Sequence, residues 1–201
     1  MVRADGRLTV YRGFMTGYRG FMTGGLAPEF TFETVVLGSG NRFAHAAAVA
    51  VAEAPGAAYN PLFIYGGPRS GRTRLLHALG NYARQLHPAL DVRYVDAAEF
   101  GSQSAAAACD SGRGEPGRRY LDAGMLLVGD IQLLPAAGAV QEGFLRVFNA
   151  MHDGGKQRAV SSDRAPGHLA SLGAGLRDRL GWGLVTEAGP PELDTRAAAR
   201  C

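Results

Sequence analysis

The segment FIYGGPRSGRTRLL, residues 63–76, constrains the fold of this chain more than any other stretch. An apolar run typical of a buried strand leads into a glycine-rich turn, and the turn leads into a segment whose leucines have helical spacing. Such a turn gathers backbone N–H groups at the N-terminus of a helix, where they can bind a phosphate. Gly66, Gly71 and Thr73 have the spacing of a phosphate-binding loop. The sequence therefore predicts a βα unit that carries an anion site.

Three residues of this loop depart from the usual motif. Arg72 occupies the lysine position, and a guanidinium is wider than an ammonium and needs fork-like partners. Arg69 stands where the loop often needs glycine for left-handed torsion angles, and Pro68 removes one N–H donor. Two interpretations stay open: a nucleotide site that works with a different cation, or a turn that has stopped binding. Of the 21 lysine and arginine residues only Lys156 is lysine, so Arg72 also fits a general preference for arginine.

Patterns typical of strands and helices alternate over the rest of the chain. Apolar runs predict strands at residues 60–67, 92–95, 124–130, 158–163 and 182–187. Periodic segments predict helices at residues 41–54, 72–88 and 139–155. Strands separated by helices favour parallel βαβ units with helices on both faces of the sheet. A chain of 201 residues is long enough for one such α/β domain and too short for two of ordinary size.

The three predicted helices have identifiable caps and apolar faces. Asn41 is the expected cap of the first helix. The second helix places four apolar residues on one face: Leu75, Leu79, Tyr82 and Leu86. The third helix does the same with five: Val140, Phe144, Val147, Phe148 and Met151. These faces are expected to pack against the sheet.

Two regions are predicted to lack a stable core. Residues 11–17 are repeated identically at 18–24, and two copies of so short a unit cannot form a repeat fold. We expect a disordered leader over residues 1–25. Residues 101–124 contain almost no large apolar side chains and are punctuated by glycine and proline, so any helix there is expected to be weakly anchored.

The end of the predicted strand MLLVGD, residues 125–130, bears on catalysis. Sites that hydrolyse nucleotides place an acidic pair at such a strand end, where it holds Mg²⁺ and orients the attacking water. Here Asp130 is preceded by Gly129, so only one carboxylate is present. We predict Thr73 and Asp130 as the ligands of Mg²⁺, although a strand-end aspartate is also common as a plain turn cap. The two motifs occurring in order favour a nucleotide site.

Composition excludes several classes of protein. A net charge of +3 tolerates an anionic partner but is not the concentrated basic stripe of a dedicated nucleic-acid binder. Cys109 and Cys201 are far apart, which argues against a disulfide framework or a metal site. No apolar run approaches the length of a membrane span and the N-terminus lacks a signal peptide. We expect a soluble cytoplasmic protein without a membrane partner.

Six segments together resemble the ATPase domain of the DnaA family of bacterial chromosomal replication initiators, which are AAA+ proteins. They are FTFETVVLGSGNRFAHAAAVAVAEAPGAAYNPLFIYGG, VRYVDAAEF, LLVGDIQLL, FNAMHDGGKQ, SSDRAPGHLASL and RLGWGLVTEAGPPELDTR. The similarity runs from residue 26 to residue 200 and looks strongest to actinobacterial members. It implies a P-loop NTPase three-layer sandwich with a parallel five-stranded sheet over residues 26–190. Residues 191–201 would start a truncated lid helix, with the rest of the lid subdomain missing.

The resemblance also implies roles for individual residues. Those that would contact ATP or ADP are Asn41 beside the adenine and, in the Walker A loop, Gly66, Gly67, Arg69, Gly71, Arg72 and Thr73. Asp130 would be the second acidic residue of Walker B, and Asp163 the sensor 1 residue near the γ-phosphate. Arg179 would be the arginine finger that reaches the ATP of a neighbouring subunit in a filament. Each of these residues also has a simpler interpretation as a cap or a solvated charge.

The chain departs from the family pattern at several of these positions. Gly129 replaces the Walker B aspartate that would hold Mg²⁺, and Gly175 replaces a second arginine near the finger. The helix pair that would grip single-stranded DNA, residues 101–123, has small or helix-breaking residues at its apolar positions: Ser104, Ala105, Ala108 and Pro116. The helix-turn-helix domain that reads origin DNA would be absent, so binding to origin DNA is expected to be weak at most.

Three hypotheses follow. The first is a DnaA-like protein of chromosomal replication that binds ATP or ADP and hydrolyses it weakly or not at all, because the lost side chains supply most of the catalysis of phosphoryl transfer. The second is a non-catalytic regulatory module that caps or disturbs an initiator filament, with a full-length initiator or a second copy contacted through Arg179. The third is a truncated paralogue without a function.

Overall fold

The computed structural model describes residues 25–109 and 117–189. The predicted leader, apart from Gly25, and the predicted start of a lid helix lie outside the described residues. Within them, no helix is long and apolar enough to cross a membrane.

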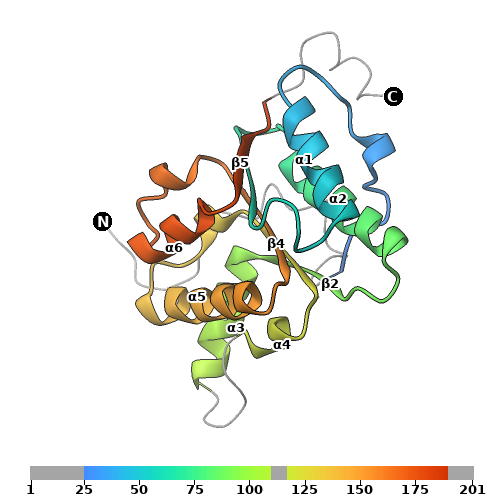
Figure 1. Cartoon of the computed structure of the whole chain (residues 1–201). Helices are drawn as coiled ribbons and strands as arrows, with labels where there is room; N and C mark the ends of the chain where they lie inside the picture. The colour runs from blue at the N-terminus through green and yellow to red at the C-terminus, as the bar shows by residue number, and fades with distance from the viewer. Residues whose placement is uncertain (1–24, 110–116, 190–201) are drawn as a thin grey trace.

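The centre of the fold is a five-stranded sheet in which every pair of neighbouring strands is parallel. The strands are β1 (Leu62–Tyr65), β2 (Val92–Asp96), β3 (Met125–Gly129), β4 (Gln157–Ser162) and β5 (Leu184–Glu187). Their order across the sheet is β2-β3-β4-β1-β5, so β1 lies between β4 and β5. Figure 1 shows β2 and β5 on opposite sides of β4. All five predicted strands are confirmed. Because the strands are parallel, their carboxyl ends meet at one edge, where ligands of open α/β sheets bind.

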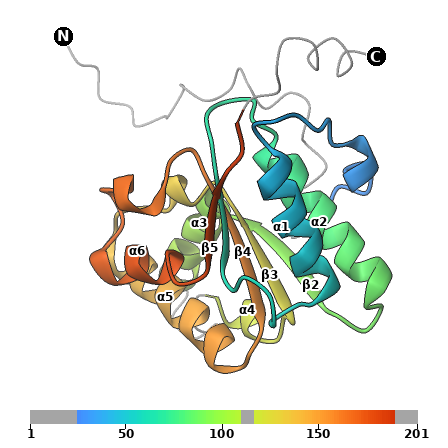
Figure 2. The ribbon, with the colours of Figure 1, turned by 45° about the horizontal axis from the view of Figure 1, so that its top comes forward.

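Helices cover both faces of the sheet and make three layers (Figure 2). One face carries α1 (Arg42–Glu53) and α2 (Arg72–Leu86). The other carries α3 (Ala97–Cys109), α4 (Arg118–Leu121), α5 (Gly138–Asp153) and α6 (Ala174–Leu180). Three short 3₁₀ helices connect them: η1 (Phe32–Thr34), η2 (Ile131–Leu133) and η3 (Pro166–His168). The predicted α/β class and three-layer architecture are confirmed.

Each face of the sheet has its own apolar core, and β3 contributes to both. Its Leu126 and Val128 lie in the core with Phe144 and Phe148 of α5. Its Met125 and Leu127 lie in the core with the buried residues of α1 and α2. A strand covered on both faces must be apolar at every position, which explains the continuous run MLLVG.

The predicted helix faces are correct except near the helix ends. In α2, Leu75 and Leu79 are buried and Tyr82 is half-buried, whereas Leu86 is 43% exposed because it is the last residue of the helix. In α5 four of the five predicted residues are buried, and Val140 in the first turn is half-buried. The buried four are Phe144, Val147, Phe148 and Met151.

The stretch 101–124 contains more helix than its composition predicts. The helix α3 extends to Cys109, and α4 begins at Arg118, after residues 110–116, which the structure does not describe. Tyr120 of α4 is buried beside Phe100, with 5.8 Å between the ring centroids. Two aromatic side chains therefore supply an anchor for a stretch that is poor in other large apolar residues.

Candidate nucleotide site

The loop between β1 and α2 has the backbone geometry of a phosphate cradle. The Gly66 N–H donates to the Ser162 carbonyl at 3.1 Å, and a Cβ at Gly66 would lie 2.1 Å from the carbonyl oxygen of Ala188. Gly71, at the N-cap position of α2, has φ +82°, a left-handed conformation that suits glycine. The loop is thus packed between neighbouring strands at its start and opens onto the N-terminus of α2 at its end, where backbone N–H groups are available to an anion.

Two residues inside the loop carry unusual features. Arg69 has φ +64°, which confirms the prediction that it occupies a left-handed position. A side chain in this region costs about 1 kcal/mol relative to glycine. Ser70 is only 3% exposed, and its Oγ has no hydrogen-bond partner among the described residues. This oxygen lies under the start of the loop, where a Cβ at Gly66 would be 2.9 Å from it, so Ser70 packs inside the turn.

A cavity of about 460 Å³ lies beside this loop. Five of the residues predicted to bind nucleotide line it: Asn41, Arg69, Gly71, Arg72 and Thr73. It is also lined by residues that were not predicted to bind nucleotide: Phe30, Val35, Val36, His45, Ser70, Arg74 and Leu75. Gly66 and Gly67 do not line it. A cavity of this size whose lining includes both apolar side chains and three arginines fits a small anionic ligand.

Asn41 acts differently from a helix cap. It occupies the N-cap position of α1, but its side chain makes no hydrogen bond to the first turn of that helix. Its Oδ1 accepts the Gly38 N–H at 2.8 Å and its Nδ2 donates to the Val36 carbonyl at 2.9 Å. Asn41 therefore braces the chain segment that forms one wall of the cavity. Its predicted N-cap position is confirmed, but its side chain does not cap the helix.

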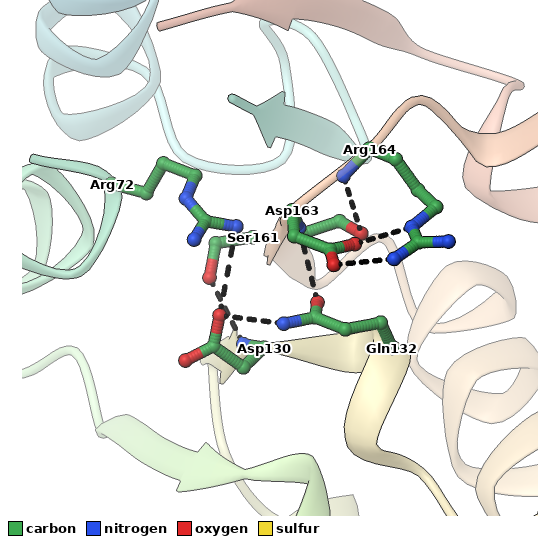
Figure 3. Close-up of polar contacts among 7 residues, drawn as sticks. Arg72, Asp130, Gln132, Ser161, Asp163 and Arg164 are labelled. Atoms are coloured by element: carbon green, nitrogen blue, oxygen red, sulfur yellow. Dashed lines mark hydrogen bonds and ion pairs between the residues drawn. The ribbon is translucent and has the colours of Figure 1, made fainter. Parts of the chain in front are cut away.

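The strand ends β3 and β4 bring the two predicted aspartates into one network (Figure 3). The Asp130 Oδ1 accepts the Gln132 side-chain N–H at 3.0 Å and lies 3.6 Å from Nη1 of Arg72. The Asp130 N–H donates to Oγ of Ser161 at 3.0 Å. Gln132 Oε1 accepts the N–H of Asp163 at 3.1 Å, so Gln132 connects both aspartates. Sequence reasoning missed Gln132 and Ser161, although both lie in the segments that carry the resemblance.

The carboxylate of Asp163 forms a salt bridge with its chain neighbour Arg164. Arg164 donates two N–H groups to it, each at 2.7 Å. This bidentate contact lowers the pKa of Asp163 below its usual value, and the more distant charge of Arg72 acts in the same direction.

Residues 26–187 match the bacterial DnaA ATPase domain. The chain belongs to this family. Domain III of the Thermotoga maritima replication initiation protein DnaA is 39% identical, with a TM-score of 0.83 over 87% of this chain and 73% of that one. DnaA from Aquifex aeolicus bound to AMPPCP is 32% identical, with a TM-score of 0.76 over 81% of this chain and 51% of that one. A replication initiator DnaA bound to AMPPCP and single-stranded DNA has the same identity and TM-score, over 81% of this chain and 50% of that one. The chain thus spans about half the length of the two AMPPCP-bound relatives.

The position that would carry the DnaA Walker B aspartate is closed by neighbouring side chains. A Cβ at Gly129 would lie 2.2 Å from the Tyr94 hydroxyl and 2.9 Å from Oδ1 of Asp96. Asp96 is the register partner of Gly129 on β2. Burial, reinforced by the charges of Asp130 and Glu99, raises the pKa of Asp96. The Tyr94 hydroxyl donates to this carboxylate.

The residues present do not fit a divalent cation at the ends of β3 and β4. Gly129 offers no ligand, and Asp130 is engaged by Gln132 and Arg72. In the described ranges 25–109 and 117–189, no three His, Cys, Asp or Glu side chains are grouped so that they could hold a metal ion. The assignment of Mg²⁺ to Thr73 and Asp130 stays a prediction that this geometry does not support.

Arg179, the expected arginine finger of the DnaA family, lies on α6 and does not line the cavity. Its Nε donates to the side chain of Asn149, and its guanidinium lies over the ring of Trp182 at 4.7 Å from the centroid. Trp182 is 52% exposed, so the pair lies at the surface. A role for Arg179 toward a neighbouring subunit stays a prediction.

Proposed function

We propose that this DnaA-family domain binds ATP or ADP in the cavity beside α2, hydrolyses it weakly or not at all, and acts in the initiation or regulation of chromosomal replication. The observation that carries the proposal is the cavity itself. It joins the loop before α2 to the wall that Asn41 braces. The AMPPCP-bound DnaA relatives support an adenine nucleotide as the ligand.

The charge of the cavity suits a polyphosphate. Arg69, Arg72 and Arg74 all line it, and no Asp or Glu is among its lining residues. The backbone N–H groups at the start of α2 add the partial positive charge of a helix N-terminus. Binding thus rests mainly on backbone donors and arginine side chains, neither of which needs the lost Walker B carboxylate.

Hydrolysis needs more than binding, since a carboxylate must orient the attacking water and charge must be stabilised in the transition state. Asp130 and Asp163 both accept N–H groups from neighbouring side chains, and Gly129 has no side chain to contribute. These contacts leave the strand ends poorly equipped to position water. We therefore expect slow turnover or none.

Isothermal titration of the full chain with ATP and with ADP tests the binding. We expect saturable binding that Arg72→Ala weakens at least about tenfold, because the phosphates lose a buried charge partner. Arg146→Ala is the matched control, since Arg146 is exposed on α5, on the opposite face of the sheet. The absence of binding at millimolar nucleotide would contradict the proposal.

Steady-state phosphate release tests the second half of the proposal. We expect a rate indistinguishable from that of nucleotide in buffer. Turnover above this background that Asp130→Asn abolishes would show that the strand end is catalytic after all.

The surface pair of Arg179 and Trp182 favours a second candidate function, a module that caps or disturbs an initiator filament. Arginine and tryptophan are enriched at the centres of protein interfaces, and this pair is presented on α6 and the turn that follows it. Purified full-length initiator from the same cell should bind the chain and lose binding on Arg179→Ala but not on Arg146→Ala. Failure of the two proteins to form a complex would count against this function.

A further inference from the structure

We propose that Arg72 takes the place of the divalent cation, so that this site binds free nucleotide without Mg²⁺. The guanidinium would bridge the carboxylate of Asp130 and the phosphates of the ligand. This inference rests on the proposed nucleotide binding and adds which form of the nucleotide is taken.

The Arg72 guanidinium is largely buried and has unused hydrogen-bond donors. Its side chain is only 14% exposed, and its Nη1 is buried without a hydrogen-bond partner among the described residues. The distance of 3.6 Å to Oδ1 of Asp130 is an ion pair and is too long for a hydrogen bond. A guanidinium carries five N–H donors in a plane, enough to contact a carboxylate and a phosphate at the same time. The buried charge is therefore positioned at the cavity with donor capacity unused.

Mg²⁺ and the Arg72 guanidinium would compete for the carboxylate of Asp130. Mg²⁺ requires oxygen ligands at about 2.0–2.1 Å in an octahedron and usually takes one or two carboxylates together with phosphates. A cation on Asp130 would sit within a few ångströms of the Arg72 guanidinium, and two positive charges at that distance repel each other strongly in a partly buried site. Gln132 already holds the same oxygen of Asp130. The guanidinium and the metal are alternatives at this carboxylate.

The space at Gly129 is closed to a metal-holding side chain. Gly129 offers no carboxylate, and the Tyr94 hydroxyl lies 2.2 Å from the position that a Cβ would take there. Asp96 reaches the same point from β2, but it is half-buried and accepts the Tyr94 hydroxyl. The elements around the strand end have thus packed into the volume that a metal-holding aspartate would need.

The decisive measurement is the affinity of the full chain for ATP in excess EDTA and in excess Mg²⁺. We expect binding in EDTA to be at least as tight as binding in Mg²⁺, because excess Mg²⁺ converts ATP into its metal complex and the Arg72 guanidinium repels the metal. Affinity at least about tenfold tighter with Mg²⁺ would overturn the inference while leaving the proposed function intact. Absence of binding under both conditions would overturn both.

One variant tests the bridging role of the guanidinium. Arg72→Lys keeps one positive charge but loses the planar fork, so we expect binding in EDTA to weaken at least about tenfold while circular dichroism stays unchanged. If instead Arg72→Lys binds equally well in EDTA, the bridging role of the guanidinium is refuted.

The competing possibility is a metal held by Asp96 and Asp130 together. In that case the wild-type chain would need Mg²⁺ for binding, and Asp96→Asn would remove this dependence. Under our proposal Asp96→Asn leaves the ratio of the EDTA and Mg²⁺ affinities unchanged. The triple variant Arg72→Lys, Gly129→Asp and Tyr94→Phe, which makes room for the carboxylate, should bind more tightly with Mg²⁺ than without it.

Discussion

The loop after β1 and the end of β3 meet at the same edge of the sheet but have diverged in different ways. In the loop, Gly66 and Gly71 hold the turn of the backbone, and arginines stand at positions 69 and 72. At the end of β3, Gly129 has no side chain, and Tyr94 and Asp96 close the space where one would lie. A function carried by backbone N–H groups survives replacement of side chains, whereas a function carried by one carboxylate is lost with a single substitution.

The largest effect is expected from a substitution that distorts the loop after β1. The substitution Gly66→Ala places a Cβ 2.1 Å from the Ala188 carbonyl, a backbone atom that has little freedom to move. We expect a loss of about 3 kcal/mol or more in the free energy of unfolding, measured by urea denaturation, together with loss of nucleotide binding. Gly67→Ala is the matched control, because nothing lies within 4 Å of its added Cβ. Equal stability of the two variants would show that the loop start is not packed as described.

The second largest effect is expected at His77. This residue lies on α2, the helix after the loop, and its ring packs against Tyr94, which lies next to Gly129 at the end of β3. The His77 Nδ1 accepts the Ala27 N–H at 3.1 Å, and the ring lies 4.3 Å from that of Tyr94. Burial lowers the pKa of His77 to about 4. Between pH 6.5 and pH 4 the unfolded chain therefore takes up a proton that the folded chain does not, and stability falls as the pH falls. The full loss is about 3 kcal/mol.

Urea denaturation at a series of pH values measures this loss. His77→Gln keeps a hydrogen-bond acceptor without a titratable ring, so subtracting its profile isolates the contribution of His77. A difference between the two profiles that does not change between pH 6.5 and pH 4 would contradict the assignment.

A smaller effect is expected at the end of β3. Gly129→Ala pushes its methyl group against the Tyr94 hydroxyl and should destabilise the fold by about 2 kcal/mol. Tyr94→Phe removes that hydroxyl, so the double variant should lose less stability than the sum of the single variants. A double-mutant cycle measures the coupling. Strict additivity would mean that Tyr94 does not fill this space.

The smallest effect is at Arg69. Replacing it by glycine relieves the left-handed backbone at φ +64° and should stabilise the fold by at most about 1 kcal/mol. Thermal denaturation measures the gain, and Arg146→Gly, in the interior of α5, is expected to destabilise instead. A loss of stability in Arg69→Gly would mean that the arginine side chain makes a contact worth more than the strain.

Much of the fold and part of the site were predictable from local patterns. All five strands follow from short apolar runs, and the phosphate loop follows from the spacing of Gly66, Gly71 and Thr73. The role of Asn41 was mispredicted because its position before a helix fits a cap, while its actual partners lie in the preceding loop. Gln132 was missed because a glutamine after a strand has no distinctive spacing.

The sequence by itself determined the α/β class, the loop and the left-handed position of Arg69, since strand runs, turns and torsion angles depend on residues close together in the chain. Only the tertiary structure decided that Tyr94 and Asp96 close the space at Gly129. It also decided that Arg72 reaches Asp130 and that Gln132 connects the two aspartates. The physical reason is that these contacts join strand ends brought together by the register and order of the sheet, and no local pattern encodes which side chain fills a space left on the neighbouring strand.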